Sequence, residues 1–501
     1  MGAYTPGSFP AASSVVSPAY SKMTLAGNYI DFTSSSTAGW AQQYLPELYE
    51  QEVDRCGNRT ISGFLSMLSA EMPLQSDQVI WSEQGRLHLS YKGVLNTGTG
   101  VISATKNIDT NAAEDHAVRV GNTLVCQYIK SGSDGTGKVF KAIVVEETSA
   151  NSLKIAPYGA ATLNAALGLG SNETDGVLTF FVYGSEFDKG TNTMSGSIEP
   201  SFKTFTNRPI IIKDHFEING SDTAQIGWIE VAGESGQGGY LWYLKSSGDT
   251  RQRFNDYMEM VMVEAEVKGS GDFTGGSNDT DALIGGVQGT EGLFSAIENR
   301  GIVATDMFDE TAGASGAAQA MADFDTLLGE LDKQGAIEEN MLYLNRASNL
   351  QIDDFLGNVS SGANGGTAYG VFENSEDMAL NLGFSGFRRG SYDFYKTDWK
   401  YLNDPQTRGA FTAADGETID GVLIPAGTSS VYDQQVGSNV RRPFLHVRYR
   451  AGAADDRKLK SWVTGSVGGP TSSNIDKMEI NYLSERCLVV QAANNFVLFK
   501  K

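Results

Sequence analysis

The segment GSDGTGK at residues 132–138 comes nearest to a known chemical motif. Gly132 and the Gly137-Lys138 pair have the spacing of a phosphate-binding loop, in which backbone N–H groups and a lysine hold phosphates. The last position of that motif is Val139 instead of Ser or Thr, so the hydroxyl that would hold magnesium is missing. The segment also joins two strand-like runs, LVCQYIK and KVFKAIVVEE, whereas a phosphate-binding loop joins a strand to a helix. A polar hairpin turn is therefore predicted here.

Two other loops carry residue types that bind ions. The run GESGQGG at residues 233–239 could hold an anion at the start of the helix that follows. Its glycines do not form GxGxxG, so a flexible joint is the better interpretation. The loop at residues 269–281 contains Asp272, Asp279 and Asp281, which could bind calcium weakly. Because it lacks the ligand order and closing Glu of an EF-hand, a solvated loop is predicted.

Cysteines and histidines are few and widely spaced. The three cysteines form no CxxC pair, which predicts buried thiols instead of disulfides or a zinc site. None of the four histidines has the spacing of a metal ligand pair, and no GxSxG or Ser-His-Asp set is present. The residues concerned are Cys56, Cys126, Cys487, His88, His116, His215 and His446. We therefore predict no catalytic residues, no cofactor, no metal site and no enzyme activity.

Length and composition indicate several folded units. A single core stops growing at about 250 to 300 residues, so a chain of 501 residues should form two or more subdomains. Hydrophobic residues make up 40% and charged residues 20% of the chain, as in ordinary globular proteins. No apolar run approaches the roughly 18 residues of a transmembrane helix, and the first residues lack the basic start and apolar stretch of a signal peptide. Synthesis in the cytoplasm is expected.

The net charge limits the partners of the chain. A formal charge of -22 argues against any wide surface that binds nucleic acid by neutralising phosphates. The same charge is compatible with a wall that encloses a polyanion without adhering to it.

The N-terminal part is predicted to be an arm and a short helical joint. Residues 1–40 are rich in Ser, Ala, Gly, Pro and Tyr and show no lasting period. Such an arm has no core of its own, so either a neighbouring molecule holds it or it straps across its own domain. Residues 41–78 are predicted to join the arm to the body through two short helices, PELYEQEVDRCG and TISGFLSMLSAEMP, the second with Phe64 and Leu65 on its apolar face.

Residues 79–190 form a β-rich excursion. Runs such as VIWSEQGRLHLSY, HAVRVGNTLVCQYIK and VLTFFVYGSEF are separated by clusters of Gly, Asn, Asp and Ser. The excursion is predicted to be an extended loop that carries an inserted β subdomain at about 101–178. Its strands have their own turn residues, so it should project from the main body.

The remainder is predicted to contain three parts. Residues 191–284 include one long helix at 240–268, in which apolar residues recur at helical spacing from Phe254 to Ala265. Residues 285–390 are predicted to form an α/β lobe, where ENMLYLN is a strand and RASNLQIDDFLG a helix capped by Asn345. Residues 391–501 are predicted to be closing strands shared by both lobes, among them SYDFYKTDWKYL and a final hairpin in CLVVQAANNFVLF.

This order of elements resembles the major capsid proteins of tailed bacteriophages with the Hong Kong 97 fold. PIIIKDHFEI followed by the helix ending YMEMVMVEAEV is similar to that family's peripheral-domain strand and spine helix. ENMLYLNRASNLQIDDFLG is similar to the strand, Asn and helix of its axial domain, and MEINYLSERCLVVQAANNFVLF to its C-terminal Glu-Arg, apolar strand, turn and Phe-Val. Size and acidity are similar to those of the crAss-like phages. The fold class expected is α+β.

The resemblance implies a subunit of an icosahedral phage head that encloses DNA, assembles with itself into pentamers and hexamers, and has no membrane partner. The charged helical scaffold segment of the family's type member is missing, which implies a separate scaffolding protein, together with portal and decoration or auxiliary proteins. A subunit made in the bacterial cytoplasm would then reside in the virion. The inserted β subdomain is expected either to bind a decoration protein or only to thicken the wall.

Eight aromatic residues of the arm and the excursion are predicted to contact neighbouring subunits. They are Tyr4, Phe9, Tyr20, Trp40, Trp81, Tyr91, Phe180 and Phe187. Two other functions remain open from the sequence. A β-rich phage tail or adhesin protein would explain the Gly-rich strands but not the long helix or the α/β lobe. A hydrolase would need a nucleophile or metal set, and the sequence offers neither.

Overall fold

The computed structural model shows an α+β chain that divides into two compact units. We call Trp81–Phe205 the barrel unit, and Met1–Ile80 with Thr206–Lys501 the body. The description covers residues 61–501, apart from 62, 66–69, 86–88, 109–110, 131–136, 170–174, 192–195, 197–201, 224–230, 233–237, 240–241, 270–286, 306, 308–315, 336, 353–369, 373–384, 412–417, 427, 434–437 and 468–470. The arm and the first predicted helix therefore lie outside the described residues.

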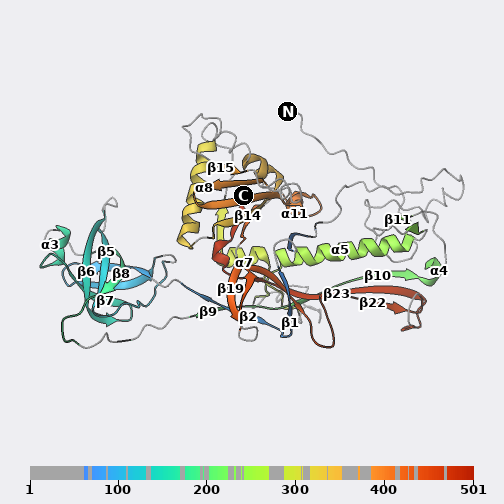
Figure 1. The fold of residues 1–501 in the computed structure, drawn as a ribbon, viewed down its shortest axis with the longest axis horizontal. Coiled ribbons are helices and arrows are strands. Elements are labelled where there is room, and N and C mark those ends of the chain that lie inside the picture. The colour runs from blue at the N-terminus through green and yellow to red at the C-terminus, as the bar shows by residue number, and fades with distance from the viewer. Residues whose placement is uncertain are drawn as a thin grey trace, which may run out of the picture. The chain divides into compact units, whose positions relative to one another are not determined.

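Six antiparallel strands of the barrel unit close on themselves in the order β3-β4-β7-β6-β5-β8. Figure 1 labels β5, β6, β7 and β8 among them. Each strand therefore pairs on both sides, and its backbone polar groups are satisfied within the barrel. The strands are β3 (Ser90–Asn96), β4 (Val101–Asn107), β5 (Asn122–Lys130), β6 (Lys138–Ser149), β7 (Ser152–Pro157) and β8 (Asp175–Ser185). The antiparallel pairing of β5 with β6 confirms the predicted hairpin around the phosphate-loop-like segment, whose residues 131–136 are outside the description.

Alternation along each strand fills the barrel. In β8, Leu178 and Phe180 are fully buried, whereas Phe181 and Tyr183 are 45% and 50% exposed. The short helix α3 (Leu163–Leu167) adds two more buried leucines to the same apolar cluster. Thr162 caps its N-terminus by accepting a hydrogen bond from the N–H of Ala165 at 3.2 Å. The barrel thus has a core of its own.

A two-stranded ribbon leads into and out of the barrel unit. It consists of β2 (Val79–Gln84) and β9 (Phe202–Asn207). The rings of Trp81 and Phe205 face each other across it, with centroids 6.1 Å apart.

The first sheet of the body is built around one long strand, β23 (Lys477–Val490). It pairs with β10 (Ile210–Asn219) along one side, and with β22 (Lys460–Gly465) and then β21 (Leu445–Arg450) along the other. β1 (Ala70–Leu74) extends the sheet by pairing parallel with β21. The prediction that residues up to Pro73 continue a helix was therefore wrong, because Ala70–Leu74 find an edge position that the local pattern does not reveal.

One face of this sheet is covered by α5 (Trp242–Glu264), which runs beside β10 and β23 in Figure 1. At 23 residues the helix is about 35 Å long. It is shorter than the predicted 240–268, because the chain turns after Glu264 into a bridge between Val267 and Gly289. Phe254, Met258 and Met262 form its buried stripe as predicted, whereas Tyr257 is 40% exposed.

The second sheet has seven strands in the order β13-β24-β18-β14-β17-β16-β15, with both parallel and antiparallel pairs. They are β13 (Ile302–Thr305), β14 (Glu339–Leu344), β15 (Gly370–Phe372), β16 (Ser385–Arg389), β17 (Tyr392–Asp398), β18 (Ile419–Pro425) and β24 (Val497–Lys500). Helix α8 (Gly316–Lys333) packs Phe324, Leu327 and Leu331 into the same apolar cluster as the sheet. The predicted strand ENMLYLN is confirmed as β14, and Asn345 caps the following helix by accepting from the N–H of Ser348 at 2.7 Å.

Smaller elements complete the body. They are α4 (Gly220–Thr223), α7 (Leu293–Arg300), α11 (Lys400–Asn403), a 3-10 turn at Arg408–Ala410, and the two-stranded pairs β11 (Val231–Ala232) with β12 (Gly238–Gly239) and β19 (Thr428–Asp433) with β20 (Ser438–Pro443). The predicted strand SYDFYKTDWKYL ends at Asp398, and its last residues form α11 instead.

The C-terminal hairpin prediction was wrong. β23 belongs to the first sheet and β24 to the second, and the 3-10 turn Ala493–Asn495 carries the chain from one to the other. β23 cannot pair with β24 because β10, β21 and β22 already occupy both of its edges. The turn contributes buried Ala493 to an apolar cluster that also contains side chains of both sheets and of α7.

Candidate functional site

One candidate site in the described part of the body surrounds Asn207, at the end of β9. Its side-chain N–H groups donate to the carbonyl oxygens of Leu488 at 2.6 Å and Glu291 at 3.0 Å. Its Oδ1 accepts from the hydroxyl of Thr290 and from the N–H of Glu291, both at 2.9 Å. Because Asn207 is only 3% exposed and all of these partners are fixed, it ties β9, β23 and the start of α7 together.

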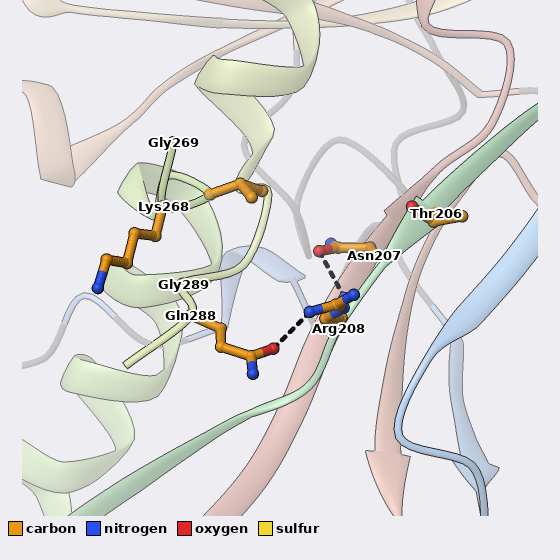
Figure 2. Close-up of a pocket in the computed structure, with 8 residues that line it drawn as sticks. Thr206, Asn207, Arg208, Lys268, Gly269, Gln288 and Gly289 are labelled. Carbon is orange, nitrogen blue, oxygen red and sulfur yellow. Dashed lines mark hydrogen bonds between the residues drawn. The ribbon is translucent and has the colours of Figure 1, made fainter. Parts of the chain in front are cut away.

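A cavity of about 400 Å³ opens beside Asn207 (Figure 2). Arg208 lies on its wall and donates from Nη1 to Oε1 of Gln288 at 2.5 Å. Lys268 is the second cation among the lining residues, and no carboxylate is among those described. Such a site can attract a small anion, but it offers no nucleophile with a base and no acid pair for catalysis.

A charged cluster, which we call the joint, connects β1 to the rest of the first sheet. Its members on β23, Glu485 and Arg486, are buried, whereas the side chains of their partners are 28% to 44% exposed. Arg486 on β23 is 7% exposed, and burial lowers the pKa of its guanidinium. It donates to Ser484 Oγ and to the carbonyl oxygen of Lys458, both at 2.9 Å, and its Nη1 lies 3.6 Å from Glu71 of β1. Glu71 also pairs with the ammonium of Lys458.

The neighbouring Glu485 carries the second half of the joint. Its carboxylate, 7% exposed, pairs with Arg457 at 3.1 Å and with Arg450 at 3.4 Å. Arg450 in turn pairs with Asp77, just beyond β1. The Glu-Arg pair singled out in the sequence therefore anchors an edge strand through buried charge, and removal of one partner would leave another charge uncompensated.

Two carboxylates of α5 hold the segment that precedes β1. Asp256 Oδ1 accepts from the N–H of Ile61 at 3.1 Å. Glu259 accepts from the N–H groups of Gly63 and Leu65 at 3.2 and 3.1 Å. Burial raises the pKa of the Glu259 carboxyl, and these N–H groups offset only part of that rise. These contacts hold residues 61–65 against α5.

The end of α5 is held to α11 and to the 3-10 turn Arg408–Ala410 by an aromatic and ionic contact. Arg408 donates to both carboxylate oxygens of Glu264, at 2.5 and 2.9 Å, and Tyr401 donates to Glu264 at 2.5 Å. The guanidinium lies over the ring of Phe294, 5.2 Å from its centroid. Burial and the nearby Glu264 carboxylate raise the pKa of the Tyr401 hydroxyl. A bidentate pair of this kind positions two elements with little freedom.

The predicted contact residues fall into different environments. Tyr4, Phe9, Tyr20 and Trp40 lie outside the described residues. Tyr91 and Phe180 lie inside the barrel, 2% and 0% exposed with ring centroids 5.8 Å apart, and Trp81 is 8% exposed. Phe187 is 45% exposed, and its ring lies so close to Gly121 that a Cβ added there would be 2.5 Å from it. Contact of these eight residues with neighbouring subunits stays a prediction.

Sequence reasoning missed an exposed aromatic face on the outside of the barrel. Phe181 and Tyr183 of β8 are joined there by Tyr158, which is 40% exposed and donates to Glu186 at 2.5 Å. The ammonium of Lys141 lies 5.6 Å from the centroid of the Tyr183 ring. The signal is present in the run FFVY, because strict alternation sends one Phe into the barrel and the other out.

The remaining chemical candidates are accounted for as follows. Cys126 and Cys487 are free and buried, and burial raises the pKa of each thiol to about 12, which confirms buried thiols at these two positions. Cys56 and the loop at residues 270–281 are outside the description. Among the described residues no group of three or more His, Cys, Asp or Glu side chains could hold a metal ion, and no helix is long and apolar enough to span a membrane.

No protein-family model matches the chain, and no curated protein matches its sequence. Solved structures with some likeness include the mature capsid of bacteriophage PhiM1, at 9% identity and a TM-score of 0.37, covering 96% of each chain. The capsid of a native GTA particle follows at 9% identity and 0.34, covering 93% of this chain and 97% of that one. A chain of Microbacterium phage Oxtober96 has 9% identity and 0.36, with 90% and 95% covered. At these values the likeness carries no conclusion on function.

Proposed function

We propose that this chain is the major capsid protein of a tailed bacteriophage and builds its icosahedral head from pentamers and hexamers. The observation that carries the proposal is the construction of the body around β23. This strand of 14 residues is paired along both edges and passes directly into the second sheet. The joint, the Asn207 contacts and the Arg408 contacts add further ties within the body, which we propose as the rigid block of the subunit.

A shell subunit needs such a block. It must keep its shape in non-equivalent positions while other segments adapt to the neighbours. The barrel unit, which folds around its own core, and the N-terminal arm are the segments proposed to make those adaptable contacts. The long helix α5 and the α/β lobe that contains α8 favour the Hong Kong 97-type shell over a β-rich tail or adhesin protein, which would not require either. Scaffolding, portal and decoration proteins, and enclosed DNA, are the partners this function requires.

Assembly is the decisive test. The purified chain, alone and with a co-expressed scaffolding protein, should form closed particles of uniform size in negative-stain images and sedimentation velocity. A stable monomer as the only species under both conditions would refute the proposal.

The arm can be tested separately. Removing residues 1–40 should leave the thermal unfolding of the body unchanged, because the apolar periodicity of the sequence begins near Leu45. Assembly of the truncated chain should be weakened or misdirected. A truncated chain that assembles normally but unfolds at a much lower temperature would instead identify the arm as an internal strap.

We propose the barrel unit as the platform for a decoration protein, with the ribbon β2–β9 and the end of β8 as contacts between subunits. Hydrogen exchange of free subunits and of particles should then show a strong rise in protection at these flanks upon assembly. Complete protection already in the free subunit would place the flanks in the internal core and contradict the proposal.

A further inference from the structure

Two lysines lie directly opposite each other on the outside of the barrel. Lys92 on β3 pairs with Lys106 on β4. Their neighbours Tyr91 and Thr105 are buried in the barrel, so alternation along the strands turns both lysines outward. Like charges that face each other across an antiparallel pair destabilise a sheet. Within the part of the chain that the structure describes, neither lysine forms an ion pair or a hydrogen bond, not even with Glu114, whose backbone pairs with that of Thr105.

The strands around this lysine pair contain almost no acidic residues. β3, β4 and β5 contain no Asp or Glu, and β8 contains only Asp175, at its first position. Lys154 on β7, by contrast, lies directly opposite Glu146 on β6. Charges farther away than about 8 Å are largely screened at physiological ionic strength. An anion close to the lysine pair is therefore attracted, although the chain as a whole has a formal charge of -22.

Exposed aromatic rings lie beside the lysine pair. β8 is the other neighbour of β3, where Lys92 pairs with Thr179 and Ser90 pairs with Phe181. Phe181 is thus the diagonal neighbour of Lys92, at about 7 to 8 Å. Phe181 and Tyr183 both point outward from β8 and are about half exposed. Cations, rings and hydroxyl groups therefore share the outer face of β4, β3 and β8, which is two strand spacings or roughly 10 Å wide.

We propose that the outer face of β4, β3 and β8 binds an acidic polysaccharide, whose sugar units carry carboxylates. The carboxylates complement the charge of Lys92 and Lys106. The C–H groups on the face of a sugar ring are weakly positive, and they pack on the negative face of the Phe181 ring. The hydroxyl groups of Ser90 and Thr179 exchange hydrogen bonds with those of the sugar.

A folded acidic protein fits this surface less well. Protein interfaces are depleted in lysine and are built around a buried apolar centre. The outward positions next to the lysine pair are instead occupied by Ser90, Ser103 and Thr179, beside the exposed Val94. Nucleic acid fits less well too, because two cations neutralise only two phosphates of a polyanion that needs many such contacts. A hydrated chain of hydroxylated units matches the mixture of small polar groups, cations and rings.

The test is the binding of polygalacturonate, a polymer of uronic acid, to the full-length free subunit at low salt. We expect saturable binding that weakens as sodium chloride is added, and no binding of the neutral polysaccharide dextran. Lys92→Gln and Lys106→Gln together should weaken binding about tenfold, as the loss of two exposed ion pairs predicts. Phe181→Ser should weaken it about fivefold through loss of the ring contact. Lys154→Gln is the matched control and should bind as the wild type does.

Polyglutamate separates a sugar from a protein ligand, because it carries carboxylates without sugar rings. It should bind more weakly than polygalacturonate, and Phe181→Ser should not change its binding. Polyglutamate binding that equals or exceeds that of polygalacturonate would identify a site for an acidic protein and contradict the proposal. Polygalacturonate that fails to bind, or that binds the double lysine variant as it binds the wild type, would overturn it. Thermal unfolding of each variant verifies that the barrel is folded, and failure of the proposal would leave that of a capsid subunit untouched.

Discussion

The barrel unit and the body solve the same folding problem by different means. In the barrel unit every strand pairs on both sides and one apolar cluster fills the interior. The barrel unit contains 10 Lys and Arg residues and 12 Asp and Glu residues, which gives a formal charge of -2. The rest of the chain contains 28 Lys and Arg residues and 48 Asp and Glu residues, which gives a formal charge of -20. The body is built from two open sheets: ion pairs hold β1 at the edge of the first sheet, and the turn Ala493–Asn495 leads from β23 of the first sheet to β24 of the second.

The difference teaches where each unit can fail. A closed barrel depends on packing alone, because its backbone groups are satisfied internally. The body depends on packing and also on ion pairs between residues that lie hundreds of positions apart in the sequence, such as Glu71 and Arg486. β1 illustrates the point, since it pairs with a strand some 370 positions along the chain, as the contact of Ala70 with His446 shows. Its exposed Pro73 lacks a backbone donor, as suits an edge strand.

The largest expected effect comes from opening the barrel core. Leu178→Ala removes a fully buried side chain and should cost about 3 kcal/mol, the usual loss for a leucine truncated in a packed core. Because the barrel has its own core, only its transition should shift, and peptides of the body should keep their hydrogen-exchange protection. Val139→Ala, at a position 68% exposed, is the control. Equal destabilisation of both units by Leu178→Ala would show that they fold as one.

The second effect concerns the joint. Glu71→Gln leaves the buried guanidinium of Arg486 without its partner on β1 and should destabilise the body by about 2 kcal/mol. Lys460→Gln breaks an exposed pair with Asp455 and should change stability by less than about 1 kcal/mol. Chemical denaturation measures both. If the two substitutions change the free energy of unfolding equally, the pair between Glu71 and Arg486 does not hold β1 in the sheet. The body would then not depend on buried charge more than the barrel unit does.

A smaller effect is expected from salt. Repulsion within a unit of charge -20 is screened as ionic strength rises, while partly buried pairs are screened less. The melting temperature of the body should therefore rise with added sodium chloride by more than that of the barrel unit. Hydrogen exchange resolved by peptide assigns the transitions, and an equal response of the two units would show that net charge does not distinguish them.

The smallest effect concerns pH. Burial gives the Glu259 carboxyl a raised pKa in the folded state, so its contribution to stability is full below its ordinary pKa of 4.5 and is lost as the pH rises through the raised value. Relative to Glu259→Gln, the wild type should therefore lose stability over this window, as measured by chemical denaturation at a series of pH values. Glu330→Gln, at an exposed ion pair, serves as the control. A difference between wild type and Glu259→Gln that is constant with pH would argue against this assignment.

The sequence by itself determined the elements whose signal is local. The stripe of Phe254, Met258 and Met262 marks α5, because a helix brings every third or fourth residue to one face. The cap at Asn345 after β14 is also recognisable locally, because a short polar side chain at the start of a helix satisfies nearby backbone N–H groups. Two buried cysteines followed from composition alone.

Only the tertiary structure decided which distant segments meet. CLVV and NFVLF have the pattern of two strands, and nothing within them indicates that each pairs in a different sheet. The same holds for β1, read as the end of a helix, and for Lys396, whose contact with Asn349 depends on the pairing of β14 with β17. The physical reason is that periodicity reports the direction of a side chain relative to its own backbone. Which distant segment a strand pairs with depends on which of many possible long-range pairings buries the most apolar surface and leaves the fewest polar groups unpaired.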